Sequence, residues 1–193
     1  LEILNEDILK TDVSAILGDE KSYKVVANLP YYITQAVIRH FLESKPQPEL
    51  MVLMVQKEVA EAIAITRGKM GILSISVAYY GKARLVADVS AQSFYPPPKV
   101  DSAILRIDVS PQPRINVADE ADFFNLVRAA FAAPRKKLVN SLAQGLKVEK
   151  EETQALLEKA AIQGGRRAES LSLNEWSNLF AVYHREGKRL ADS

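Results

Sequence analysis

The chain has 193 residues, of which 48% are hydrophobic and 25% are charged, as is usual for a globular protein. Its 25 basic and 24 acidic residues leave a formal net charge of +1, so any nucleic-acid surface must come from local clusters of Lys and Arg. The absence of cysteine excludes disulfides and thiolate metal sites, two distant histidines argue against a metal centre, and no apolar run reaches the roughly 20 residues of a membrane span.

The first half alternates strand-like and helix-like stretches, the pattern of an α/β sheet. Residues 24–27 predict a short buried strand that ends at Asn28, and a helix follows with apolar residues at helical spacing over 33–42. Residues 50–56 form a continuous apolar run, as expected for a strand covered on both faces. Residues 57–66 are predicted to be helical.

The segment 72–80 fits either a helix or a strand, and we favour a helix. Two strands follow, over 83–89 and 103–109. The connection between them contains Phe94-Tyr95-Pro96-Pro97-Pro98, whose prolines lack amide donors and hold the chain extended.

Composition changes at residues 110–113, which read as a linker, and nearly everything after it is helical. The predicted helices are one capped by Asp119 that stops near Pro134, a basic amphipathic one over 135–144 ended by Gly145, one over 149–162, and a last one opened by the capping box of Ser172 and Glu175. We therefore expect an α/β domain over residues 1–110 and a small all-α domain over residues 111–193.

The stretch Asn28-Leu29-Pro30-Tyr31 lies where the first predicted strand ends, and ligands of open α/β sheets bind at such ends. The Asn28 side-chain oxygen and the backbone carbonyl of Leu29 or Pro30 are suited to accept hydrogen bonds from an exocyclic adenine amine. Two acceptors favour a pyramidal nitrogen whose lone pair points at an activated methyl group. Tyr31 offers an aromatic face to an unstacked base, although a strand ending in a polar turn beside a core tyrosine explains the same four residues.

A second stretch, Phe94 to Ala103 (FYPPPKVDSA), decides between these interpretations. Together with NLPYYI at 28–33, it closely resembles the small-subunit ribosomal RNA adenine dimethyltransferases. Shorter similarities run along the whole chain, at residues 56–59, 71–74, 130–131, 135–136, 140–142, 167–169 and 171–172.

The resemblance implies part of a class I, Rossmann-like methyltransferase sheet followed by a small helical domain. It implies S-adenosylmethionine as cofactor and dimethylation of the N6 amines of two adjacent adenosines near the 3′ end of small-subunit ribosomal RNA. Catalytic roles would fall on Asn28, Leu29, Pro30, Tyr31 and Phe94, with Phe94 against the second face of the base. Asp7, Asn28 and Leu29 would contact the cofactor.

The family's Gly-rich cofactor loop has no counterpart here, since Gly68, Gly71 and Gly81 are dispersed and do not join a strand to a helix. The resemblance places the start of this chain at about the third strand of the usual sheet. From this we expect an exposed apolar sheet edge and little methyltransferase activity from the chain alone.

Basic residues cluster twice in the second half, at Arg135, Lys136 and Lys137 and at Arg166 and Arg167. Most such runs are solvated helix faces, but the resemblance favours contacts of the first cluster with RNA phosphates. For the second cluster, RNA contact and helix capping are equally compatible with the pattern.

The predicted partner is small-subunit ribosomal RNA within its particle, bound by a cytoplasmic, monomeric protein that needs no metal and no membrane. Two alternatives stay open: a large-subunit ribosomal RNA adenine methyltransferase of the macrolide-resistance type, and a non-catalytic RNA-binding ribosome-assembly factor. A DNA adenine methyltransferase is disfavoured because such enzymes usually carry Asp or Ser where Asn28 stands.

Overall fold

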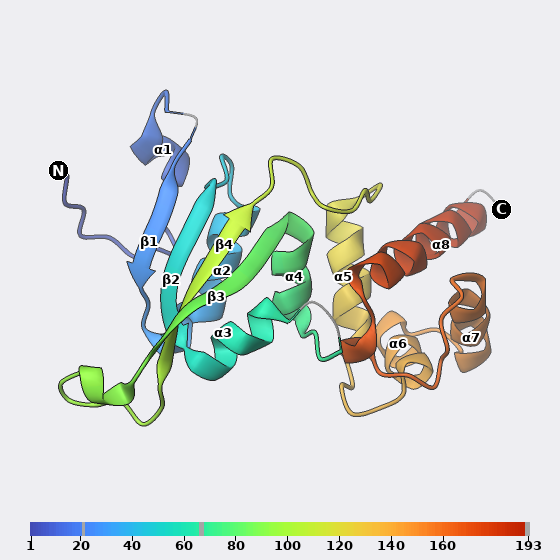
Figure 1. The fold of residues 1–193 in the computed structure, drawn as a ribbon. Coiled ribbons are helices and arrows are strands. Elements are labelled where there is room, and N and C mark those ends of the chain that lie inside the picture. Colours follow the sequence, from blue (N-terminus) through green and yellow to red (C-terminus); the bar gives the residue numbers. More distant parts are fainter. Residues whose placement is uncertain (21, 66–67, 192–193) are drawn as a thin grey trace. The chain divides into compact units, whose positions relative to one another are not determined.

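The computed structural model describes residues 1–20, 22–65 and 68–191, the last five by their backbone alone. The chain divides into two compact units (Figure 1). The first unit comprises Leu1–Ala64 and Ser76–Arg114, and the second comprises Ile65–Ile75 and Ile115–Ser193. Met70 ties the inserted segment to the second unit, since its amide donates to the carbonyl of Glu169 over 2.9 Å.

The first unit is built on a four-stranded sheet with the order β1-β2-β4-β3. Its elements are α1 (Val13–Leu17), β1 (Lys24–Asn28), the 3₁₀ turn η1 (Tyr31–Ile33), α2 (Thr34–Glu43), β2 (Leu50–Gln56), α3 (Lys57–Ala64), the second half of α4 (Ile72–Tyr80), β3 (Gly81–Val89), η2 (Ala91–Ser93) and β4 (Ser102–Val109). The predicted strands and helices of this half are therefore present, and 72–80 is a helix. The predicted end of α3 at Thr66 lies outside the described residues.

Strand direction brings distant residues to one end of this sheet. β1 and β2 run parallel, with Asn28 beside Met54, whereas β4 runs antiparallel to β2, with Ser102 beside Gln56. The carboxyl end of β1 therefore lies at the same end of the sheet as the start of β4. The β3–β4 connection projects beyond that end (Figure 1).

One face of the sheet carries the hydrophobic core of this unit. Alternate residues of β2 and β4, such as Met51 and Leu105, are fully buried, and the helices α2 and α3 lie on this face (Figure 1). The apolar residues on the other face are less covered, and Val26 of β1 is 80% exposed. The prediction that β2 is covered on both faces is wrong for the described residues, because no described helix of this unit lies over the second face.

The second unit is helical. Its elements are the first half of α4, α5 (Glu120–Ala130), α6 (Leu138–Leu146), α7 (Lys150–Lys159), the 3₁₀ turn η3 (Ala168–Ser170) and α8 (Leu173–Ala191). No helix within the described ranges has the length and apolar character that crossing a membrane requires.

Aromatic side chains form the core of the helical unit. Phe123 meets Phe180 edge to face at 5.7 Å, and Trp176, fully buried as expected for a core residue, stacks on Phe131 at 6.1 Å. Helices α5 and α6 approach so closely at Gly145 that a Cβ there would lie 2.1 Å from the carbonyl oxygen of Ala129. Gly145 therefore lies inside α6 as a packing residue, and its predicted role as the end of the helix is wrong.

Both predicted caps of this unit are confirmed. The Asp119 carboxylate accepts from the Asp122 amide over 2.8 Å at the start of α5. At the start of α8, Ser172 and Glu175 form the reciprocal capping box, with amide-to-side-chain distances of 2.8 and 3.3 Å. Short polar side chains at these positions satisfy amide groups that have no partner within the helix.

The predicted basic helix over 135–144 starts later than expected. Residues 132–137 form turns, and α6 begins at Leu138, whose amide donates to the Arg166 carbonyl over 2.6 Å. The next amide, of Val139, donates to the Gly164 carbonyl over 3.2 Å. Because these tertiary bonds take the first helical amides, the helix cannot extend back through the basic residues. The helix predicted over 149–162 likewise ends early, since Ala161 has a left-handed backbone with φ of 56°.

Candidate functional site

A pocket opens where β1 ends and the β3–β4 connection begins. Its volume is about 370 Å³, within the usual range for small-molecule sites. The lining residues are Asn28, Leu29, Pro30, Tyr31, Phe94, Tyr95, Pro96, Pro98 and Ser102. All five residues predicted to be catalytic thus lie around one pocket, although about sixty positions in the sequence separate the two segments.

Backbone bonds hold the turn that follows β1. The Leu29 amide donates to the Met54 carbonyl of β2 over 3.3 Å. The Pro30 carbonyl already accepts from the Ile33 amide at 3.2 Å and from the Thr34 hydroxyl at 3.4 Å. The Leu29 carbonyl accepts no hydrogen bond from the described residues, and the exposed Asn28 side chain makes none with them. Two acceptors, the Asn28 side-chain oxygen and the Leu29 carbonyl, therefore remain available at this turn.

The Tyr31 ring is attached to the sheet through its hydroxyl. The Tyr31 hydroxyl lies 2.8 Å from the Ser102 hydroxyl, and Ser102, the first residue of β4, is only 1% exposed. Because the ring is held at its backbone by η1 and at its far end by this bond, its orientation is set by two segments that are distant in sequence. Sequence reasoning did not assign a role to Ser102, although it is part of the recognised FYPPPKVDSA stretch.

Hydrogen bonds join the two ends of the β3–β4 connection, which contains Phe94. The Asp101 carboxylate accepts from the Ala91 amide over 2.9 Å, and the Asp101 carbonyl accepts from the Lys57 amide over 3.0 Å. The Lys57 ammonium pairs with Asp88 at 2.7 Å, and this hydrogen bond raises the pKa of Lys57. Asp101 therefore organises the turn after the prolines. Lys57 contributes to the same closure; it lies in the similar stretch at 56–59, but sequence reasoning gave it no role.

The pocket combines two hydrogen-bond acceptors that have no partner among the described residues with two aromatic rings. The acceptors belong to the turn after β1, and the rings are those of Tyr31 and of the half-buried Phe94. Such a set suits a planar base with an exocyclic amine, which needs acceptors at one edge and apolar faces above and below. No group of three or more His, Cys, Asp or Glu side chains is arranged to hold a metal ion within the described ranges.

Asp7, predicted to contact a cofactor, does not line this pocket. Its carboxylate accepts from the Leu9 amide over 3.1 Å and lies 3.7 Å from the ammonium of Lys10. The structure therefore brings Asn28 and Leu29, but not Asp7, to the pocket.

The first basic cluster forms an exposed turn, which we call the basic turn and define as Arg135, Lys136 and Lys137. Within the described part of the chain, none of these three side chains makes an ion pair. The Lys136 ammonium donates to the Gln144 side chain over 3.2 Å. Three adjacent positive charges thus stand in solvent on the helical unit.

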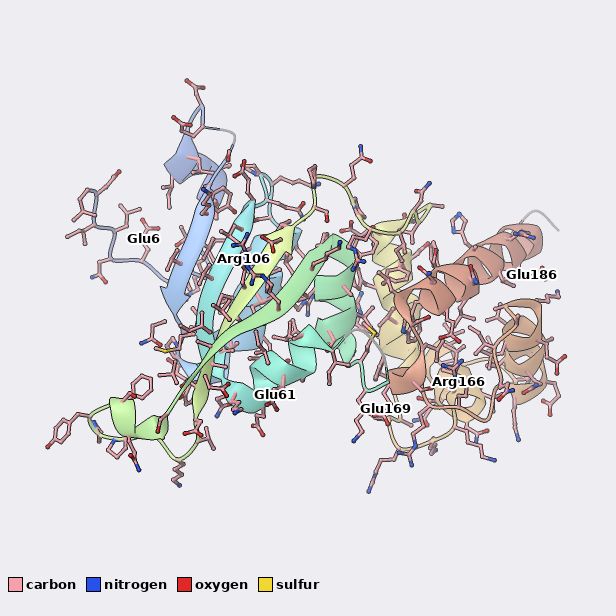
Figure 2. The ribbon with its side chains drawn as sticks, viewed as in Figure 1. Glu6, Glu61, Arg106, Arg166, Glu169 and Glu186 are labelled. Atoms are coloured by element: carbon pink, nitrogen blue, oxygen red, sulfur yellow. The ribbon has the colours of Figure 1, made fainter. Side chains whose placement is uncertain are left out.

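The two arginines of the second cluster differ from each other. The Arg166 guanidinium forms an ion pair with Glu175 and donates to the Ser170 carbonyl over 2.6 Å. The hydrogen bond from Arg166 lowers the pKa of Glu175 to about 2. Arg167 is 57% exposed and lies 3.8 Å from Glu169. Arg166 therefore links η3 to α8, whereas the Arg167 side chain is accessible to solvent. Figure 2 labels Arg166 and Glu169, the acidic neighbour of Arg167.

The sequence profile described as "Ribosomal RNA adenine dimethylase" matches residues 1–185. A protein named "Ribosomal RNA small subunit methyltransferase A" from Dehalococcoides mccartyi (strain 195) is 52% identical over 181 residues, covering 94% of this chain and 62% of that relative. One of the same name from Clostridium acetobutylicum is 40% identical over 179 residues, covering 92% and 64%. The chain thus spans less than two thirds of these relatives.

Solved structures show the same fold. The 23S rRNA methyltransferase ErmE aligns with a TM-score of 0.69 and 25% identity, over 94% of this chain and 71% of that one. A dimethyladenosine transferase from Plasmodium falciparum aligns with a TM-score of 0.70 and 25% identity, over 86% and 68%. The predicted Rossmann-like α/β fold followed by helices is therefore confirmed.

Proposed function

This chain belongs to the ribosomal RNA adenine dimethylase family, and from that premise we propose that it forms the base-binding and RNA-binding part of a small-subunit ribosomal RNA adenine dimethyltransferase. The product would be N6,N6-dimethyladenosine at two adjacent adenosines near the 3′ end of that RNA. The observation that carries the proposal is the pocket in which Asn28, Leu29, Tyr31 and Phe94 meet.

In this proposal the target amine donates one hydrogen bond to the Asn28 side chain and one to the Leu29 carbonyl. The sequence left Leu29 and Pro30 as alternative second acceptors, and the bonds that the Pro30 carbonyl already accepts favour Leu29. Both acceptors draw the amine hydrogens to one side, which turns the nitrogen lone pair toward the methyl group. Tyr31 and Phe94 hold the base between them after it has left its stack.

We propose S-adenosylmethionine as the methyl donor, which supplies an electrophilic, sulfur-bound methyl group. Leu29 is 8% exposed and lines the pocket beside Asn28, so these two residues fit a cofactor placed next to the base. Asp7 stays a prediction, since its carboxylate lies outside the pocket lining.

The basic turn and Arg167 would contact RNA phosphates. All four side chains are exposed, and phosphate neutralisation needs exposed positive charge more than fixed geometry. Arg166 would act indirectly, by positioning Arg167 through its bonds to Glu175 and Ser170.

The proposal is tested by methyl transfer to unmethylated small-subunit particles. The protein assayed is this chain joined to the residues of the 52%-identical Dehalococcoides mccartyi relative that lie outside the match, which we call the completed chain. We expect N6,N6-dimethyladenosine in small-subunit RNA and none in large-subunit RNA. Methylation of large-subunit RNA alone would instead support the alternative suggested by the fold of ErmE. Tight particle binding without any methyl transfer would support the assembly-factor alternative.

A further inference from the structure

Tyr95 stands at the rim of the pocket with its side chain fully in solvent, at 101% relative exposure. We propose that Tyr95 is a stacking platform for the nucleotide next to the target adenosine in single-stranded RNA. The proposal rests on the proposed function and adds a second base-binding position to it. A large aromatic ring so exposed beside a candidate nucleic-acid site gains most from a partner with a flat, apolar face.

The backbone separates Tyr95 from the position of the target base. Phe94 has extended φ and ψ angles of −118° and 153°, and successive side chains of an extended chain point to opposite sides. Phe94 is half-buried, while its neighbour Tyr95 is open to solvent. The proposed function assigns the two faces of the target base to Tyr31 and Phe94, so the base that Tyr95 meets belongs to another nucleotide.

The chain holds Tyr95 in place without covering it. Pro96, Pro97 and Pro98 follow it directly, and each has a restricted φ and no amide donor. The bond between the Asp101 carboxylate and the Ala91 amide closes the base of the connection. The connection and its side chains stand out beyond the end of the sheet (Figure 2). A platform held in this way loses little conformational freedom when a base stacks on it.

Stacking on a tyrosine distinguishes poorly among bases, because every base has a π face. Tyr95 is therefore expected to fix where the strand leaves the pocket, without reading the identity of the neighbouring base. This ordering of the strand beside the target would help keep the target base in the pocket after it has left its stack.

Tyr32 provides a matched control. Its side chain is 88% exposed and it directly follows the pocket residue Tyr31, just as Tyr95 follows Phe94. Unlike Tyr95, however, it does not line the pocket. A general affinity of exposed tyrosines for RNA would involve Tyr32 as much as Tyr95.

The experiment measures binding of the 193-residue chain to a short single-stranded RNA in which 8-vinyladenosine, a fluorescent nucleoside that keeps the N6 amine of adenosine, replaces either the target adenosine or a nucleotide on one side of it. Stacking on an aromatic ring quenches this fluorescent base. With the unchanged chain we expect quenching at the target position and at one flanking position. Tyr95→Ala should abolish the flanking quench, preserve the target quench and weaken binding by roughly tenfold, the scale of one stacked base. Tyr95→Phe should restore both.

The outcomes separate the platform from the proposed function. Flanking quenching that survives Tyr95→Ala, or that is lost equally in Tyr32→Ala, overturns the platform and leaves the proposed function standing. Loss of the target quench in Phe94→Ala with the flanking quench retained supports both assignments. An unchanged target quench in Phe94→Ala contradicts the proposed role of Phe94 but not the platform. An unchanged chain that quenches neither probe overturns both.

Discussion

We propose that the pocket at the end of β1 and the basic turn before α6 both bind RNA, yet different interactions hold the two regions. Bonds between distant segments hold the pocket residues, as between the hydroxyls of Tyr31 and Ser102 at 2.8 Å. The basic turn has exposed charges and no ion pair within the described residues. The comparison teaches that, in the proposed function, the pocket would act through geometry and the turn through charge. Substitutions in the pocket should therefore have large effects that depend little on salt.

Asn28→Ala should separate the two regions most clearly. Loss of one preorganised hydrogen-bonding group typically lowers turnover by about 10²- to 10³-fold, so we expect that loss in methyl transfer by the completed chain. Particle binding should stay nearly unchanged, because the basic turn is intact. Gln92→Ala, at an exposed residue that does not line the pocket, serves as control. An equal loss of transfer and binding would contradict the division of roles.

Glu175→Gln tests whether Arg166 differs from the free charges of the basic turn. The Arg166–Glu175 pair has side-chain exposures of only 30% and 31%, so we expect the substitution to lower the free energy of unfolding by about 1–2 kcal/mol. The exposed pair of Arg39 and Glu43 on α2 is the control, and Glu43→Gln should cost about 0.3–0.5 kcal/mol. If Glu175→Gln and Glu43→Gln lowered the free energy of unfolding equally in denaturant, the Arg166–Glu175 pair would contribute no more than an exposed ion pair.

The same pair predicts a dependence on pH. The folded protein holds the pKa of Glu175 at about 2, below its ordinary value of 4.5, so its stabilisation is complete above that ordinary value. The stabilisation should be lost as the pH falls from 4.5 toward 2. The unfolding free energies of Glu175→Gln and of the unchanged chain should therefore converge over this range. If the difference in unfolding free energy between the two proteins stayed constant down to about pH 2, the ion pair would not be the source of the stabilisation.

Tyr31→Phe and Ser102→Ala test how the pocket is held. Each substitution removes one side of the hydroxyl pair, and we expect each to cost about 1 kcal/mol of stability and to slow methyl transfer several-fold. The double variant should be little worse than either single one, because both lose the same bond. Fully additive losses of rate and stability would show that the two hydroxyls act independently.

Reversing one charge in the basic turn should have the smallest effect of these substitutions, and that effect should be on particle binding. Arg135→Glu and Lys136→Glu are each expected to weaken particle binding a few-fold at low salt and less as salt is raised. Lys150→Glu, an equally exposed change on the same unit, should have little effect. Unchanged binding in both basic-turn variants would remove this cluster from the RNA-contacting surface.

Local signals in the sequence predicted most of the fold. Asp119, Ser172 and Glu175 occupy the capping positions assigned to them, because a short acceptor side chain at a helix start satisfies nearby amides. The strand over 50–56 matches β2, since a long apolar run between polar turns has few other structures open to it. The start of α6 was missed because its first amides bind carbonyls near residue 165, which no local pattern reveals.

The residue types at the candidate site were already evident from sequence. Asn28, Leu29, Pro30 and Tyr31 follow from a short motif whose chemistry suits an adenine amine, and the family resemblance carried by the second stretch implied Phe94. Ser102 and Lys57 were missed because their roles depend on β4 running antiparallel to β2, which brings the hydroxyl of Ser102 to Tyr31.

By itself, the sequence determined the local elements, their caps and the residue types of the pocket, since these depend on neighbours a few positions apart. The tertiary structure alone decided which distant segments meet. It joined two turns about sixty positions apart into one pocket, assigned Ile65–Ile75 to the helical unit, and distinguished the paired Arg166 from the free Arg135. The physical reason is that a carbonyl, hydroxyl or guanidinium can pair with any suitable group that folding brings near, and sequence spacing does not encode that distance.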